Sequence, residues 1–451
     1  MITVNILKVL GKNHWALVSP EWSFLIFGML FVLLKILNRR IGFNLVWAFC
    51  VAIGLALLFR QLFGPQKFVL FGDSIHGSHK TAAFELVLYT SMLLSLPSLK
   101  TVAANVQEEV RALWFFFWGS LFFLVMSVSL LNIFLFAEAA SLLLLCMAWI
   151  GRNRDTLWRA LIYNAVSDLL LLAGMGLLFY LSTNQNLPNA ISENPFLFDT
   201  LAGFFSTNNE PWMLVALGLT LCGLFAKLGM FPMHFASADI YEGSHLSTIA
   251  LTMSFKVALV CVLWHGMHGG LAVFVAVGVV VAAVASITEP HTKRFLAHSD
   301  SLQLGLLLLC GDLKSFIAGM LAYVVAMQCL LGVLSHLNAD DAFPFNNLYK
   351  RSIGLTWAWI IPLVLFAGIP PFPGFFQKGQ LLKPLLFEGQ AVVFWTLLFA
   401  LWVGSYGYIK RIRDSFYDFR GAPDEPSIVL TRFWKITFIC LASAIVFLPV
   451  I

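Results

Sequence analysis

Four ionisable side chains lie near the middle of long apolar segments of this chain. Glu138 is in "LLNIFLFAEAASLLLLCMAW", Lys227 in "LFAKLGMFPMHF", Lys256 in "STIALTMSFKVALVCVLW" and Lys378 in "FAGIPPFPGFFQKGQLL". A charge at bilayer depth costs roughly 2.5 kcal/mol or more. Burial lowers the pKa of a lysine, and a nearby carboxylate raises it again. A lysine that gains and loses such a partner can bind and release a proton near neutral pH. These residue types therefore indicate a proton relay.

Other polar residues could connect these four groups. His234 follows Pro232 by two residues and could extend a relay from Lys227, although a hydrogen-bonded core histidine explains it equally well. Further candidates, each closer to the end of an apolar segment, are Asp168, Asp300 and Gln303. Structural explanations stay open for two of the main four. Lys378 could extend its amine to the membrane surface, and Glu138 could form a static ion pair with one lysine.

The composition is that of a membrane protein. Of the 451 residues, 60% are hydrophobic and only 11% are charged, whereas a soluble domain is about half apolar and a quarter charged. No basic stripe with interleaved aromatic residues is present, so nucleic-acid binding is not expected. The seven cysteines show no C-x-x-C or Cys/His spacing. The chain is therefore expected to hold no metal, cofactor or redox centre of its own.

Apolar runs of about 20 residues predict an all-α polytopic membrane protein with about fourteen transmembrane helices. The expected spans are approximately 22–37, 43–63, 82–98, 112–130, 132–150, 158–182, 211–235, 247–266, 269–287, 299–311, 314–337, 354–387, 391–409 and 433–451. The first of these lacks a small-residue cleavage site and is expected to be a retained span rather than a signal peptide.

Two of the spans are expected to be broken in mid-membrane. Pro232 interrupts the segment that contains Lys227, and "GIPPFPGFF" precedes Lys378. Comparable broken spans, each beside a lysine, suggest two inverted repeats. The expected division is residues 1–111 as N-terminal helices, 112–266 as a first half, 267–409 as a second half, and 410–451 as a loop and C-terminal helix.

The distribution of basic residues predicts the orientation. Clustered lysines and arginines follow the first, third, fifth, ninth, eleventh and thirteenth expected spans, which all end on one side, whereas the polar stretch from Ser182 to Trp212 on the opposite side contains none. Basic loops lie in the cytoplasm, so both termini are expected on the outer, periplasmic side of a bacterial inner membrane.

The motifs resemble those of the antiporter-like subunits of respiratory complex I. "FAKLGMFPMHFASADIYEG" is similar to that family's lysine–proline–histidine segment, and "TKRFLAHSDSLQLG" to its basic, serine- and glycine-containing stretch. "AGIPPFPGFFQK" resembles its broken-helix motif, and "LFAEAAS" its glutamate helix. The resemblance runs from about Leu131 to Leu382. The "DIYEG" segment and the terminal lysine, Lys378, resemble the N-type subunit most closely.

The resemblance implies a role for each buried group. Glu138 becomes the carboxylate partner of Lys227, Lys256 the central connecting lysine, and Lys378 the terminal lysine that exchanges protons with the outside. His234 would belong to the same relay. The implied function is a non-redox, proton-translocating membrane subunit of an NADH–quinone oxidoreductase, a translocase.

The resemblance also implies what surrounds the chain. NAD, FMN, iron–sulfur clusters and quinone are expected in partner subunits, and the chain itself is expected to contact other membrane subunits and lipid. Two alternatives stay open. The chain could belong to a multisubunit sodium/proton antiporter or inorganic-carbon transporter, or it could be a scaffold whose lysines are inert.

Overall fold

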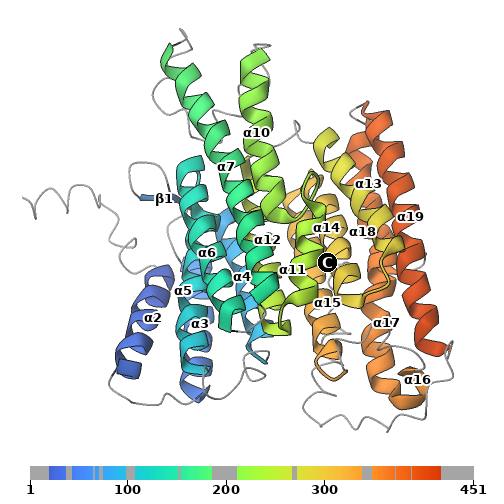
Figure 1. Ribbon diagram of the computed structural model, residues 1–451, viewed down its shortest axis with the longest axis horizontal. Coiled ribbons are helices and arrows are strands. Elements are labelled where there is room, and N and C mark those ends of the chain that lie inside the picture. Colours follow the sequence, from blue (N-terminus) through green and yellow to red (C-terminus); the bar gives the residue numbers. More distant parts are fainter. Residues whose placement is uncertain are drawn as a thin grey trace, which may run out of the picture. The chain divides into compact units, whose positions relative to one another are not determined.

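The computed structural model describes residues 20–36, 43–63, 67–70, 75–97, 107–150, 154–184, 211–266, 272–337, 348–370, 372–387 and 389–417. These residues are helical apart from one hairpin and short connections (Figure 1). The elements are α2 Pro20–Ile36, α3 Phe43–Phe63, β1 Lys67–Leu70, β2 Ile75–Ser78, α4 His79–Ser95, α5 Gln107–Met126, α6 Leu130–Ile150, α7 Arg154–Asn184, α10 Pro211–Leu228, α11 His234–Gly243, α12 Leu246–Gly266, α13 Ala272–Thr288, α14 Thr292–Leu308, α15 Leu313–Leu334, α16 Leu348–Arg351, α17 Ile353–Ala367, α18 Pro373–Phe387 and α19 Ala391–Phe416.

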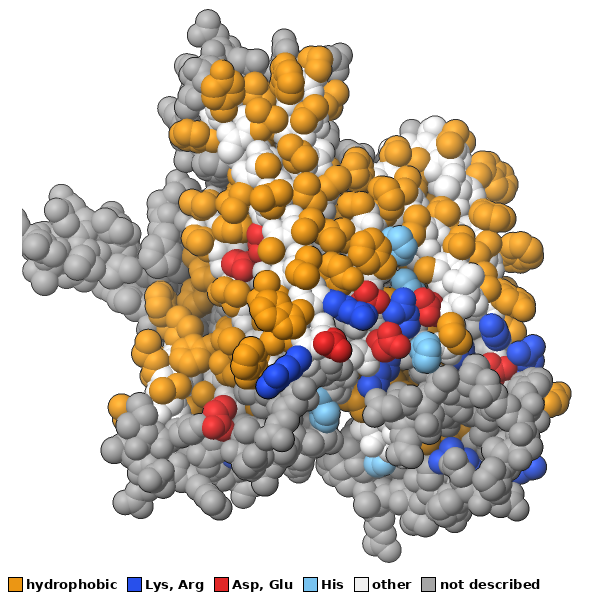
Figure 2. Space-filling model, viewed as in Figure 1, with side chains coloured by type: hydrophobic (Ala, Val, Ile, Leu, Met, Phe, Trp, Pro, Cys, Tyr) orange, Lys and Arg blue, Asp and Glu red, His pale blue; other side chains and the backbone are white. Residues whose placement is uncertain are grey.

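The all-α membrane architecture expected from the sequence is confirmed. Seven of the described helices are long and apolar enough to cross a bilayer: α5, α6, α7, α10, α12, α15 and α19. Shorter apolar helices, among them α13 and α17, accompany them. Figure 2, viewed as in Figure 1, shows hydrophobic side chains over most of the described surface in this view. The predicted number of fourteen spans is not confirmed, because the last expected span, 433–451, lies outside the described residues.

The chain forms two compact units. Unit 1 is Met1–Lys227 with Leu251–Gly270, and unit 2 is Leu228–Ala250 with Leu271–Ile451. In unit 1, α5 packs against both α2 and α6; in unit 2, α13 packs against both α14 and α19 (Figure 1). The division expected from the sequence, into residues 1–111, 112–266, 267–409 and 410–451, stays a prediction.

Aromatic rings fill the interior of unit 1 where α2, α3 and α5 meet. Phe24 stacks on Phe122, with ring centroids 5.0 Å apart, and meets Phe49 edge-on at 5.5 Å. Phe49 in turn meets Phe115 edge-on at 5.0 Å. Such offset and edge-on pairs are the arrangements that the ring quadrupoles favour. The phenylalanine-rich sequence of these helices therefore provides a packed interior rather than only a lipid-facing surface.

Both predicted helix breaks are present. α10 ends at Leu228, a cis peptide bond joins Phe231 to Pro232, and α11 begins at His234. The expected span 211–235 is therefore two helices rather than one. The carbonyl oxygen of Gly229 accepts a hydrogen bond of 2.8 Å from Ser301 Oγ of α14. This bond satisfies one of the backbone groups that the break releases.

The second break separates α17 from α18. α17 ends at Ala367 and is capped by Gly368, whose φ of 64° is left-handed and favours glycine. A Cβ on Gly374, at the start of α18, would collide with the carbonyl oxygen of Leu365. Glycine at this position therefore lets the first turn of α18 lie directly against the end of α17. The discontinuous helix expected over 354–387 is confirmed.

The expected span 299–311 is wrong at its start. α14 begins at Thr292 and includes Lys293, His298 and Asp300, all of which are buried. These polar residues lower the local hydropathy, which is why the sequence suggested only a short run. Surrounding helices cover α14 on every side, and polar partners on those helices satisfy part of its side chains. α14 is therefore an internal helix of unit 2.

Candidate functional site

Lys227 lies in a cluster of charged and polar groups within unit 1. Its Nζ is 2.6 Å from Asp168 Oδ1 and 3.0 Å from Glu138 Oε2, and it donates a hydrogen bond of 2.9 Å to Asn164 Oδ1. The lysine side chain is 2% exposed, against 23% for Glu138 and 15% for Asp168. A buried ammonium is thus held by two carboxylates and an amide oxygen.

Asn164 also links the two acids to each other. Its Nδ2 donates to Glu138 Oε1 at 3.0 Å and to Asp168 Oδ2 at 2.8 Å. Ser141 Oγ donates to Glu138 Oε2 at 3.2 Å, one turn along α6. Buried polar groups are costly unless they are hydrogen-bonded. Here three helices, α6, α7 and α10, provide the partners of one network.

Two glycines allow α7 and α10 to approach closely enough for these contacts. A Cβ on Gly223 of α10 would lie 2.8 Å from the backbone nitrogen of Leu171 and the carbonyl oxygen of Ser167. A Cβ on Gly174 of α7 would lie 2.6 Å from the backbone nitrogen of Thr220. Small residues at helix crossings bring membrane helices together in this way. Gly223 is one turn before Lys227, so the crossing positions the ammonium beside α7.

An ammonium held between two carboxylates is an arrangement that can bind and release a proton. With all three groups ionised, Glu138, Asp168 and Lys227 carry a net charge of −1, so the cluster can accommodate a further proton. Removing one partner of a buried ion pair typically costs 3–5 kcal/mol, because the other charge is left uncompensated. Displacing a carboxylate from Lys227 would therefore favour loss of the lysine proton.

Sequence reasoning found part of this cluster and missed the rest. The structure places Glu138 beside Lys227, as the resemblance implied. Asp168 was expected only as a further candidate near a span end, and Asn164 was not identified. Asn164 and Asp168 are four residues apart on α7, a spacing that places both on one helix face. This spacing was the only sequence pattern that linked the two residues. It indicates that they share a helix face, but it does not indicate that this face contacts Lys227.

Lys256 is buried in α12 within unit 1, and Ser254 precedes it by two residues. The hydroxyl oxygen of Ser254 is 2.8 Å from that of Ser91 in α4. Glu85, on the same helix α4, is a further buried carboxylate that sequence reasoning missed. The connection of Lys256 to the other lysines stays a prediction.

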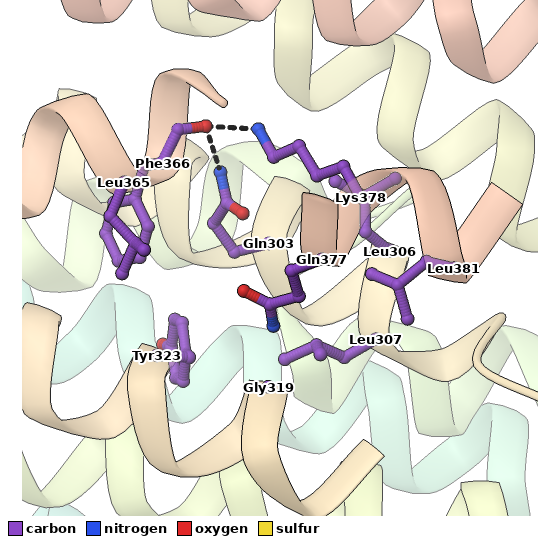
Figure 3. A pocket seen from close by; sticks show the side chains of 10 residues that line it. All are labelled: Gln303, Leu306, Leu307, Gly319, Tyr323, Leu365, Phe366, Gln377, Lys378 and Leu381. Carbon is purple, nitrogen blue, oxygen red and sulfur yellow. Dashed lines mark hydrogen bonds between the residues drawn. The ribbon is translucent and has the colours of Figure 1, made fainter. Parts of the chain in front are cut away.

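Lys378 lies in unit 2 and turns its amine toward the end of α17. Its Nζ donates to the carbonyl oxygen of Phe366, which also accepts a 3.2 Å hydrogen bond from Gln303 Nε2 (Figure 3). Gln303 Nε2 is in addition 3.0 Å from the hydroxyl of Tyr408. Lys378 and Gln303 line a small cavity with Tyr323 and Gln377. The amine of Lys378 therefore points into unit 2.

His234 is the first residue of α11, and its ring lies 6.2 Å from that of His298 in α14. His298 Nε2 is 3.7 Å from Glu289 Oε1. These residues are all in unit 2, so the expected connection of His234 to Lys227 stays a prediction.

Arg294 holds a group of three carboxylates beside these histidines. Arg294 Nη1 is 2.8 Å from Asp239 Oδ1 and 3.0 Å from Glu242 Oε2, and its Nε is 3.1 Å from Glu289 Oε2. The arginine thus ties α11 to α14 and to the segment that precedes α14. Within the described part of the chain, no three His, Cys, Asp or Glu residues are placed to hold a metal ion.

Comparison with known proteins identifies the architecture. The model of the family described as NADH:quinone oxidoreductase/Mrp antiporter, TM, matches residues 127–404. NADH-quinone oxidoreductase subunit N of Thioalkalivibrio sulfidiphilus is 24% identical over 81% of each chain. The subunit of that name from Ruthia magnifica is also 24% identical, over 92% of this chain and 91% of the relative.

Solved structures share the fold. A chain of respiratory complex I from Thermus thermophilus with bound aureothin superimposes with a TM-score of 0.78, at 23% identity and 96% coverage of both chains. A chain of the membrane-bound sulfane sulfur reductase, an archaeal respiratory membrane complex, also has a TM-score of 0.78, at 17% identity over 96% of this chain and 94% of the other.

Proposed function

We propose that this chain, which belongs to the NADH:quinone oxidoreductase/Mrp antiporter transmembrane family, is a membrane subunit of an NADH–quinone oxidoreductase. In this proposal the chain translocates protons and carries out no redox chemistry itself. The observation that carries the proposal is the burial of Lys227 between Asp168 and Glu138, at 2.6 and 3.0 Å. Subunit N relatives, which align over more than four-fifths of the chain, support the same assignment.

The cluster supplies one proton-binding step of the translocation. With both carboxylates in contact, the ammonium form of Lys227 is favoured, and the lysine holds a proton. When electron transfer in other subunits displaces Glu138 or Asp168, the buried ammonium loses part of its stabilisation and releases that proton. Lys256 and Lys378 are the proposed next acceptors, and Lys378 exchanges protons with the outer side.

The surroundings of the two acids support a neighbouring membrane subunit. Glu138 and Asp168 are partly exposed on a face of α6 and α7 that also exposes Leu135, Leu142 and Leu172. A carboxylate that faced hydrocarbon would be costly. A partner helix that brings a polar or basic group to this face would cover both acids. We place NAD, FMN, iron–sulfur clusters and quinone in such partners rather than in this chain.

The test is the substitution Lys227→Ala in the assembled membrane complex. Membrane vesicles are supplied with NADH, and proton uptake is followed with a pH-sensitive dye while electron transfer to quinone is measured separately. We expect the number of protons moved per electron to fall sharply, with the complex still assembled. Lys314→Ala, which removes an exposed lysine from the start of α15, should pump normally. A normal proton-to-electron ratio in Lys227→Ala would contradict the proposal.

The second candidate is a subunit of a sodium/proton antiporter or inorganic-carbon transporter without redox partners. The inclusion of Mrp antiporters in the same family favours it. Purification of the native complex separates the two candidates. Flavin- and iron–sulfur-containing partners support the oxidoreductase, whereas a set of purely membrane-embedded partners supports the transporter.

A further inference from the structure

We propose that Asp300 is the proton-exchanging carboxylate of unit 2 and that it serves Lys378 through Tyr323 and the cavity between them. This inference rests on the proposed function, and it adds a residue and a route to it. In unit 1 the acids contact the lysine directly. In unit 2 a phenol hydroxyl and a space of water size lie between the acid and the lysine.

Asp300 lies at the centre of unit 2, on the internal helix α14, and is 0% exposed. Tyr241 of α11 donates a hydrogen bond of 2.7 Å to Asp300 Oδ2. Tyr323 of α15 donates a hydrogen bond to Asp300 Oδ1. Both tyrosines are themselves buried. Each carboxylate oxygen therefore accepts a hydrogen bond from a tyrosine hydroxyl, so both oxygens of this buried acid have a partner.

Tyr323 connects this acid to the lysine. Tyr323 and Lys378 line one cavity, which Gln303 and Gln377 also line (Figure 3). The cavity has a volume of about 20 Å³, which is enough to hold a water molecule. Its polar lining provides the two to four hydrogen-bond partners that a buried water requires. The structure thus has room for a water between the amine and the phenol.

The polar lining is continuous from α14 to the lysine. Gln303 is one turn after Asp300 on α14, and its amide donates to the same Phe366 carbonyl that accepts from Lys378. Tyr408 of α19 receives the other hydrogen bond of that amide. The groups of Asp300 and of Lys378 therefore share one polar region inside unit 2.

The transfer step balances in protons and charge. The Lys378 ammonium gives a proton to the cavity water, and that water gives one to the Tyr323 oxygen. Tyr323 passes its own hydroxyl proton to Asp300. The lysine becomes a neutral amine, the aspartate becomes a neutral acid, and water and tyrosine are regenerated. The opposite charges of the half-buried lysine and the buried aspartate disappear together, so the step relieves the cost of burying them.

Phenols from three elements lie close to Asp300. Tyr241 approaches from α11, Tyr323 from α15 and Tyr408 from α19. A carboxylate that served only structure would matter for assembly and stability, because the hydroxyls of Tyr241 and Tyr323 would lose their acceptor when it is replaced. A proton carrier would require the acidic group and the Tyr323 hydroxyl for transport itself.

The experiment compares Asp300→Asn, Asp300→Glu and Tyr323→Phe in the assembled complex. Removing a proton-transfer group typically lowers a rate by about a hundredfold or more, so we expect Asp300→Asn and Tyr323→Phe to lose most proton translocation at matched electron flux. Asp300→Glu should restore a large part of it. Tyr406→Phe, which removes an exposed hydroxyl from α19, should behave as the parent protein.

A dependence on Lys378 distinguishes transport from packing. Combining Asp300→Asn with Lys378→Ala should lose no more translocation than Lys378→Ala alone, because both changes interrupt one step. If Asp300→Asn fails to assemble, Tyr323→Phe tests the inference instead, since it keeps the ring and removes only the hydroxyl.

Normal translocation in assembled Asp300→Asn or Tyr323→Phe would overturn the inference. If Lys227→Ala fails to pump while Asp300→Asn pumps normally, the proposed function stands and this inference fails. Normal pumping in Lys227→Ala contradicts the proposed function itself.

Discussion

The two carboxylates beside Lys227 lead to a quantitative prediction about partial redundancy. The perturbations are Asp168→Asn, Glu138→Gln and the double variant, each of which removes charge while keeping shape. At an effective dielectric constant of about 20, a unit charge pair at 2.6 to 3.0 Å attracts by roughly 5–6 kcal/mol. Repulsion between the two acids and loss of hydration offset much of that attraction. A single substitution leaves Lys227 with one ion partner, and the double substitution leaves it with none.

The size of the effect in the double variant follows from the loss of the last carboxylate beside Lys227. Leaving a buried charge without compensation costs about 3–5 kcal/mol, and each 1.36 kcal/mol corresponds to a factor of ten. The cost therefore corresponds to a factor of roughly 10² to 10⁴ against the buried, protonated Lys227 in the double variant. We expect each single variant to keep an intermediate rate of proton translocation. The double variant should fall to the level of Lys227→Ala.

The assay uses NADH-energised vesicles, with initial proton uptake divided by electron flux to quinone and with assembled complex quantified for every variant. Asp155→Asn is the matched control, because Asp155 is exposed in the first turn of the same helix α7. Parent-like pumping in Asp168→Asn together with complete loss in Glu138→Gln would refute the reasoning. That result would mean that Asp168, although 2.6 Å from the ammonium, does not share the role.

Three further substitutions test how the sites are positioned. Gly223→Ala should lower the yield of assembled protein, because its Cβ would lie 2.8 Å from backbone atoms of α7, whereas Gly218→Ala on the same helix meets open space and should not. Gly374→Ala should displace the start of α18 and lower proton translocation, because its Cβ would collide with a backbone oxygen of α17; Gly379→Ala, in open space on the same helix, should have no effect. Arg294→Ala should destabilise unit 2 by roughly 1–3 kcal/mol, because the partly buried Asp239 and Glu289 and the exposed Glu242 lose their shared cation. Thermal unfolding of the purified complex measures this change, and an unchanged midpoint would show that the network contributes nothing.

The sequence alone determined the class of the fold and the places where helices stop. Hydropathy is a sum over about 20 consecutive residues, so the bilayer-length helices could be predicted from local information. The breaks after Leu228 and after Ala367 follow from glycine and proline, whose backbone effects are also local. Buried ionisable residues were recognisable because charges are rare at bilayer depth. That rarity identified Glu138 and Lys227 as candidates, and the resemblance to antiporter-like subunits implied that they pair.

Only the tertiary structure decided which polar groups meet. Glu138 and Lys227 are 89 residues apart in sequence, and helix packing, which no local pattern specifies, brings Asp168 and Asn164 to the same ammonium. Packing likewise placed Asp300 between two tyrosines from other helices, although its polar neighbours had made α14 look like a short span. The hydropathy of a residue depends on that residue alone. The partners that stabilise a buried charge, in contrast, come from helices that are distant in the chain. The spans could therefore be predicted from the sequence, and the proton-binding clusters required the packed structure.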